Sequence, residues 1–113
     1  MHEFGVAQGL LNVVLAKMAE NAGSRIVWIK LEIGVLSGVE EEALRFAFTA
    51  LAEGSPAQNT ELRVEKIPLR CYCSVCDSVF ECRPFAYRCP SCGMASHDVR
   101  TGKEMNVVAM EIT

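Results

Sequence analysis

Two pairs of closely spaced cysteines constrain the fold of this chain more than any other sequence feature. Cys73 and Cys76 form the first pair, Cys89 and Cys92 form the second, and twelve residues separate the pairs. A Cys-x-x-Cys turn brings two thiolates to one ion, and two such turns supply the four soft ligands of a tetrahedral Zn²⁺ site. Four protein ligands leave no open coordination position, so the spacing predicts a structural zinc rather than a catalytic one.

The clustering of all the cysteines and the character of the N-terminus favour metal binding in a reducing compartment. All six cysteines lie between Cys71 and Cys92, and the N-terminus lacks the basic region of a secretory signal. We therefore expect a cytoplasmic protein, in which clustered cysteines hold metal more often than they form disulfides. Disulfides, redox-active thiols and an iron–sulfur cluster are the alternatives. Cys71 and Cys82 are not needed for a four-cysteine zinc site and are expected to be free thiols. Because Cys71 lies two residues before Cys73, an alternative set of ligands that uses Cys71 stays open.

Around the cysteine segment, apolar spacing predicts an α+β domain. Residues 3–21 have the period of an amphipathic helix, and residues 27–33 alternate as in a half-buried strand. Ser37 and Glu40 fit a capping box at the start of a second helix, which Pro56 would end. We expect strands over 62–69 and 105–112, and therefore two helices packed on a small sheet of about three strands with an inserted zinc ribbon.

The predicted domain organisation is discontinuous. Residues 1–68 plus 103–113 would form the α/β domain, and residues 69–102 would form the zinc-ribbon domain. The ribbon segment has few large apolar residues, so bound metal would supply its folding energy, on the order of 10 kcal/mol.

The first three residues, Met1-His2-Glu3, can act as a metal chelate. The Met1 α-amine, the deprotonated amide of His2 and the His2 imidazole form fused rings in one plane, and the Glu3 backbone amide could fill the fourth position. Square-planar nitrogen coordination suits Ni(II) or Cu(II) rather than Zn²⁺. A solvated terminus without a metal role is the alternative for such a motif.

Several motifs occur in the order seen in a known family. Met1-His2-Glu3 is followed by Ile33-Gly34-Val35-Leu36-Ser37-Gly38-Val39, then Leu44-Arg45-Phe46-Ala47-Phe48, and finally Cys89-Pro-Ser-Cys92-Gly93. This order resembles the hydrogenase nickel-incorporation proteins of the HypA/HybF family over nearly the whole chain. The resemblance implies a metallochaperone that binds Ni(II) at its N-terminus, with His2 as the essential ligand, and carries a structural zinc ribbon.

The resemblance also implies partners and further candidate ligands. Family members work with the GTPase HypB and deliver nickel to the large-subunit precursor of [NiFe]-hydrogenase, and in some organisms to urease. His97 is a candidate second nickel ligand, with an exposed loop histidine as the alternative. Glu40 occupies a position where some members carry an acidic residue near nickel, although a helix cap is the favoured interpretation. A homodimer formed by exchange of a strand or ribbon is a further expectation.

Two other functions compete with a nickel chaperone. A zinc ribbon can bind protein or nucleic acid, and basic residues cluster near the knuckles, but the net charge of −3 argues against nucleic acid. A thiol redox enzyme would use Cys71, Cys73 or Cys82, but these residues lack a thioredoxin-like context. The sequence has no recognisable catalytic triad or phosphate-binding loop, so we expect no enzyme activity. The basic residues near the knuckles are Lys66, Arg70, Arg83, Arg88 and Arg100.

Overall fold

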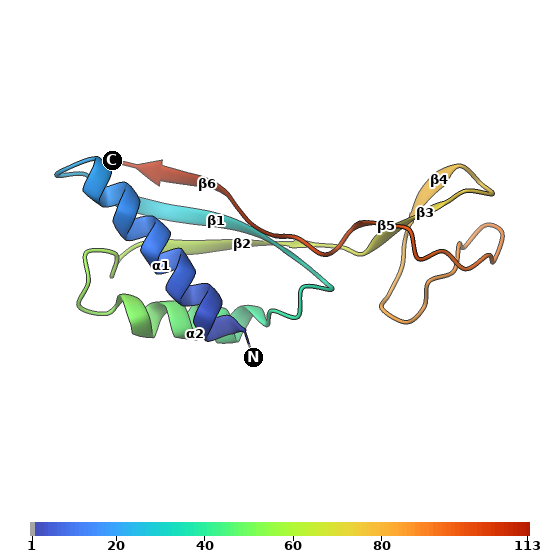
Figure 1. The fold of residues 1–113 in the computed structure, drawn as a ribbon, viewed down its shortest axis with the longest axis horizontal. Helices are drawn as coiled ribbons and strands as arrows, with labels where there is room; N and C mark the ends of the chain where they lie inside the picture. Colours follow the sequence, from blue (N-terminus) through green and yellow to red (C-terminus); the bar gives the residue numbers. More distant parts are fainter. Residues whose placement is uncertain (1) are drawn as a thin grey trace. The chain divides into compact units, whose positions relative to one another are not determined.

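The structure is a computed structural model that describes residues 2–113 (Figure 1). The chain divides into two compact units, which we describe separately. The first contains the described residues up to Leu31, together with Gly38–Val64 and Val107–Thr113; the second contains Glu32–Ser37 and Glu65–Asn106. The boundaries of the zinc-ribbon domain at residues 69 and 102 stay a prediction. The elements are α1 Glu3–Glu20, β1 Ile26–Gly34, α2 Glu41–Ala52, β2 Glu61–Ile67, β3 Arg70–Cys73, β4 Ser78–Glu81, β5 Val99–Thr101 and β6 Met105–Ile112.

A three-stranded sheet in the order β2-β1-β6 confirms the expected α+β fold. Arg25 and Thr113 exchange two backbone hydrogen bonds, and the Gly34 N–H donates to the Glu104 carbonyl, so β6 runs antiparallel to β1. The Thr60 hydroxyl donates to the Ile26 carbonyl at the start of both strands.

The ends of β1 and β2 also meet, because the Val35 N–H donates to the Ile67 carbonyl at 3.0 Å. The two strands therefore run parallel, and parallel neighbours need a crossover connection. α2 lies between them in the chain and provides that crossover. The apolar run Met105–Ile112 predicts a last strand in this sheet, and the structure places that strand beside β1.

The core of the first unit lies between the two helices and the sheet. From α1 it takes the predicted apolar stripe, in which Ala7 and Val14 have no exposed surface. From α2 it takes Leu44 and Phe48, whose spacing of four places them on one helix face. The strand β1 adds the last apolar layer with Ile29 and Leu31, which are both fully buried.

The start of β1 departs from the predicted alternation. The alternation over residues 27–33 predicts that Val27 faces the core, but Val27 is 39 % exposed and Ile26 is buried instead. On the open surface, the Trp28 indole N–H donates to Glu111 on β6, and the Arg63 guanidinium of β2 lies 4.5 Å from the ring centroid. Trp28 therefore has polar partners within its own sheet.

The second helix begins later than the capping-box pattern predicts. α2 starts at Glu41, and Glu40 rather than Ser37 is its N-cap. The Glu40 carboxylate accepts hydrogen bonds from the backbone N–H groups of Glu42 and Ala43, which would otherwise lack partners in the first helical turn. The prediction of Ser37 as the N-cap was wrong because the same Ser–Glu spacing also occurs when the glutamate itself is the N-cap and the helix begins after it.

The second unit contains a small antiparallel sheet in the order β4-β3-β5. In the β3–β4 hairpin, Cys71 pairs with Phe80 and Cys73 pairs with Ser78. None of the described helices is both long enough and apolar enough to span a membrane.

Candidate metal sites

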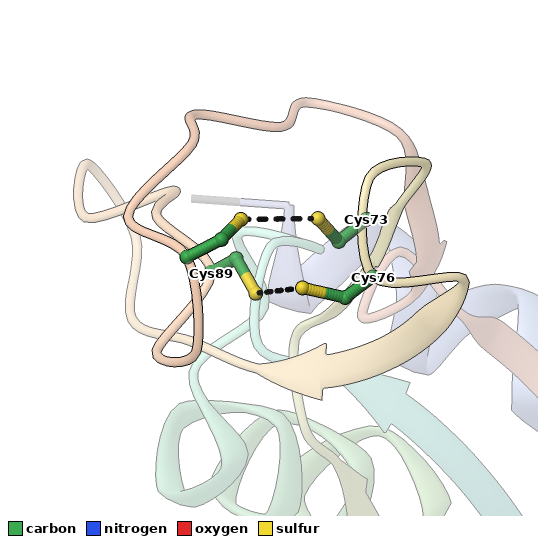
Figure 2. Close-up of side chains that lie close together, drawn as sticks. Cys73, Cys76 and Cys89 are labelled. Carbon is green, nitrogen blue, oxygen red and sulfur yellow. Dashed lines mark hydrogen bonds between the residues drawn. The ribbon is translucent and has the colours of Figure 1, made fainter.

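Four cysteine sulfurs converge in the second unit. The side chains of Cys73, Cys76 and Cys89 point toward a common centre (Figure 2), and their sulfurs and that of Cys92 all lie within 4.8 Å of one another. The Cys73–Cys92 sulfur distance is 3.6 Å and the Cys76–Cys89 distance is 3.8 Å. Tetrahedral zinc with a Zn–S bond of about 2.3 Å requires sulfurs about 3.8 Å apart. The donor set and its spacing therefore fit one zinc ion.

Local backbone geometry brings each pair of sulfurs together. Cys73 ends β3 and Cys76 lies in the turn before β4, where Asp77 adopts a positive φ of 50°. In the second knuckle, Gly93 has a φ of 78°, and its N–H donates to the Cys89 carbonyl at 2.8 Å. Such turns direct backbone amides toward the sulfurs that they surround.

The electrostatics of the four sulfurs favour a bound cation. Backbone N–H groups of Cys92 and Ser91 lower the pKa of the Cys89 thiol to about 7, because they stabilise the thiolate. The neighbouring sulfurs of Cys92 and Cys89 raise the pKa of Cys76 to about 12. Adjacent thiolates repel one another, and a divalent ion at their centre removes that penalty.

The core around this cluster is small and consists largely of cysteine. Leu36, from the loop after β1, packs against it, a contribution that the cysteine spacing does not reveal. A core of this size is typical of domains that depend on metal for their stability. Its buried members are Leu69, Cys71, Cys73, Phe80 and Cys89.

The two surplus cysteines are in contact with each other. Cys71 Sγ lies 3.8 Å from Cys82 Sγ, outside the four-sulfur group. Burial and the neighbouring Cys82 raise the pKa of Cys71 to about 11, so its side chain is a neutral thiol at neutral pH. The alternation of residues in a β3–β4 hairpin is the sequence signal that could have predicted this contact.

Two of the residues predicted to bind nickel, His2 and Glu3, lie at the start of α1. His2 is exposed and is the N-cap of α1, and its carbonyl accepts the Val6 N–H at 2.9 Å. The imidazole lies beside Gly38, because a Cβ atom at Gly38 would be 3.9 Å from the His2 Cδ2. Met1, whose amine is a predicted ligand, lies outside the described residues.

The Glu3 side chain connects the start of α1 to the start of α2. It is only 7 % exposed, and its Oε2 accepts the backbone N–H of Glu40 at 2.8 Å. Glu40 in turn uses both carboxylate oxygens to cap α2. Glu3 and Glu40 are far apart in sequence, so no local pattern could indicate their contact.

The other candidate residues lie in the second unit. His97 is exposed, and its ring centroid is 4.5 Å from that of Tyr87. Two basic residues near the knuckles have acidic partners: Arg70 lies 3.7 Å from Glu81, and Arg100 lies 2.9 Å from Asp98. These ion pairs weaken the case for a basic surface that binds nucleic acid.

Comparison with known proteins identifies relatives along the whole chain. Residues 1–112 match the family described as "HypA: Hydrogenase/urease nickel incorporation, metallochaperone, hypA". The hydrogenase maturation factor HypA of Chloroflexus aggregans (strain MD-66 / DSM 9485) is 38 % identical over 112 residues, which cover 98 % of each chain. The HypA of Geobacter sulfurreducens (strain ATCC 51573 / DSM 12127 / PCA) is also 38 % identical, with 99 % of each chain covered.

Solved structures share the fold. The solution structure of a HypA protein superposes with a TM-score of 0.70 at 23 % identity and covers 100 % of this chain and 97 % of its own. The solution structure of the Ni metallochaperone HypA from Helicobacter pylori has a TM-score of 0.63 at 23 % identity and covers 98 % and 97 %, respectively.

Proposed function

Because the chain belongs to the HypA family of hydrogenase/urease nickel-incorporation metallochaperones, we propose that it binds Ni(II) at its own N-terminus and delivers the ion for hydrogenase maturation, with urease as a second target. The observation that supports this proposal best is the position of His2, which is exposed at the start of α1. Its imidazole is therefore accessible to an ion carried in and out by partner proteins.

The proposed nickel ligands are the Met1 amine, the backbone amide and imidazole of His2, and the Glu3 backbone amide. The first four N–H groups of an α-helix have no acceptor within the helix, so metallation of the Glu3 amide breaks no helical hydrogen bond. Four nitrogen donors in one plane suit a d⁸ ion such as Ni(II). His97 and Glu40 are retained as candidate secondary ligands, although the Glu40 carboxylate already caps α2.

The proposed zinc ligands are Cys73, Cys76, Cys89 and Cys92. When bound, zinc would hold the two knuckles together and supply folding energy to a unit with a small core. With all four positions filled by protein, it would have no site for substrate, so we propose that the protein is not an enzyme.

Partner proteins complete the proposal. We assign the GTPase HypB, the [NiFe]-hydrogenase large-subunit precursor and urease maturation proteins as partners in the cytoplasm, on the strength of the family. An open, mostly apolar hollow lies on the two helices, and Phe4 and Phe46 in it are 62 % and 68 % exposed. Its lining consists of Phe4, Glu40, Glu42, Ala43, Phe46, Ala47 and Ala50. Exposed aromatic residues beside the nickel-binding terminus are suited to partner contact.

A homodimer is also proposed. β6 is an edge strand of the β2-β1-β6 sheet, and Val107 and Val108 are 40 % and 46 % exposed. An unpaired apolar edge can pair with the same edge of a second copy. Sedimentation should show a dimer for the wild type and a monomer for Val108→Lys, because a lysine on the edge opposes pairing. A wild-type monomer at all concentrations would contradict this part of the proposal.

The deciding experiment measures both metals in an untagged chain. His2→Ala should lose nickel binding and its planar nickel absorption spectrum, and should retain one zinc per chain. His97→Ala is the matched control and should keep both the terminal nickel and the zinc. Normal nickel binding by His2→Ala would show that the terminal site is wrongly assigned.

A further inference from the structure

The two cysteines outside the four-sulfur group form a site of their own. Cys71 Sγ and Cys82 Sγ lie 3.8 Å apart, and neither residue belongs to the proposed zinc cage. We propose that this pair is a redox-modification site, which closes reversibly to a Cys71–Cys82 disulfide across the β3–β4 hairpin when a peroxide is present.

The hairpin positions the two side chains on the same face. Cys71 pairs with Phe80, and Cys82 lies two residues further along the same chain segment. Alternate residues of a strand project to one face, so Cys82 and Phe80 both lie on the Cys71 side. The Cys82 N–H donates to the Leu69 carbonyl at 3.0 Å, which extends the hairpin ladder to Cys82. Closing the disulfide requires the sulfurs to approach from 3.8 Å to about 2.0 Å, through side-chain rotation together with a small backbone shift at Cys82, which lies just beyond the end of β4.

The two thiols differ in their access to solvent. Cys71 is completely buried, whereas Cys82 is half-buried at the surface of the ribbon core. A small oxidant therefore reaches Cys82 first, and Cys71 is protected until Cys82 has reacted. This arrangement of an accessible cysteine beside a resolving cysteine is typical of reversible thiol oxidation.

The reaction balances with hydrogen peroxide as the oxidant. The Cys82 thiolate attacks one peroxide oxygen, the O–O bond breaks, and the departing hydroxide takes up the thiol proton as water. The resulting sulfenic acid is attacked at its sulfur by Cys71, which loses its proton as the S–S bond forms and a second water leaves. Overall, two thiols lose two electrons and two protons, and one peroxide is reduced to two waters.

Closure would affect the first knuckle. Cys73 and Cys76 lie within the loop that a Cys71–Cys82 bond closes, so the disulfide would keep the β3–β4 hairpin together when zinc is absent. This consequence rests on the proposed zinc cage, whereas the disulfide itself does not. In the zinc-loaded protein the four ligand sulfurs are coordinated, which leaves Cys71 and Cys82 as the only uncoordinated thiols of the chain.

The test is a peptide map of the zinc-loaded full chain after treatment with an equimolar amount of hydrogen peroxide. Remaining thiols are alkylated after unfolding, and the chain is cleaved with chymotrypsin. Cleavage after Tyr72 and Phe80 places Cys71, the Cys73–Cys76 knuckle and Cys82 in three separate peptides. The expected product joins the Cys71 and Cys82 peptides, disappears on treatment with dithiothreitol, and forms while one zinc stays bound.

Two variants and the zinc content make the result decisive. Cys82→Ser should give no cross-link and keep its zinc, with Cys71 alkylated; Cys71→Ala should instead leave Cys82 as a sulfenic or higher acid. Cross-links among the ligand cysteines with zinc loss, while Cys71 remains alkylated, would overturn the proposal. A chain that binds no zinc before oxidation but still forms the Cys71–Cys82 link would refute the cage and support the redox pair.

Discussion

The carboxylate of Glu3 accepts the backbone N–H of Glu40 at 2.8 Å, and so ties the first residue of α1 to the N-cap of α2. Removing a buried acceptor leaves its donor unsatisfied, which costs about 1–3 kcal/mol. Glu3→Ala should therefore destabilise the protein by about that amount in urea unfolding followed by circular dichroism. Glu3→Gln should lose less, because its amide oxygen can still accept the bond. Equal losses in both variants would show that the hydrogen bond is not the cause.

The same two variants separate the side-chain and backbone roles of Glu3 in nickel binding. Both retain the Glu3 backbone amide, so both should keep a planar nickel spectrum. If both variants lose that spectrum while His97→Ala keeps it, the Glu3 carboxylate rather than the amide would be the ligand.

A close backbone approach predicts that Gly34 tolerates no side chain. A Cβ at Gly34 would lie 2.1 Å from the Gly102 carbonyl oxygen and 2.6 Å from the Lys103 nitrogen. Gly34→Ala must therefore displace backbone and should cost about 3 kcal/mol or more, in the upper range of single substitutions. Gly9 in α1 has no atom within 4 Å of an added Cβ, so Gly9→Ala should stabilise by about 0.5–1 kcal/mol. A small effect at Gly34 in thermal unfolding would contradict the packing.

Loss of one zinc ligand should affect the ribbon and spare the helices. Cys76→Ser removes one thiolate, and zinc affinity should fall by more than about 100-fold, beyond the 10–100-fold effect of an outer-shell change. α1 and α2 belong to the other unit, so the helical circular-dichroism signal should remain. Ser74→Ala in the same knuckle is the control and should bind one zinc by mass spectrometry. Unchanged zinc content in Cys76→Ser would refute the ligand set.

Nickel binding should depend on pH in a definite direction. Ni(II) displaces protons from the amine, the imidazole and an amide, so acid competes with the metal. Affinity should fall by about tenfold per pH unit for each proton displaced as the pH decreases from about 8 to 6. Calorimetric titration at several pH values measures this slope. A pH-independent affinity would exclude the proposed nitrogen ligands.

The apolar hollow on the helices should matter for partner binding and not for metals. Phe46 is 68 % exposed there, and burial of such an aromatic side chain often dominates an interface. Phe46→Ser should weaken binding to the partner GTPase about tenfold or more without changing nickel or zinc content. Phe85→Ser is the matched control, because Phe85 is 98 % exposed in the other unit. Binding to the GTPase can be measured by surface plasmon resonance. If both substitutions weaken it equally, the hollow around Phe46 is not a specific binding site.

Patterns along the chain were sufficient to predict the two helices, the last strand of the sheet and the clustering of four cysteines. These features depend on short-range rules, namely helical and strand periodicity and the reach of a Cys-x-x-Cys turn. The chelate proposed for Met1-His2-Glu3 likewise depends only on covalent neighbours. The sequence could therefore indicate the four-cysteine group and the helices and strands of the fold.

Contacts between distant segments required the folded structure. The Glu3 carboxylate meets the Glu40 amide, Gly34 meets Gly102, and Leu36 packs on the ribbon core, although no local pattern links these residues. The start of α2 at Glu41 also depends on such a contact. The Glu3 carboxylate accepts the Glu40 backbone N–H, and the Glu40 side chain caps the helix. Such contacts depend on how strands and helices pack in three dimensions, and periodicity along one segment carries no information about the segment that will lie against it.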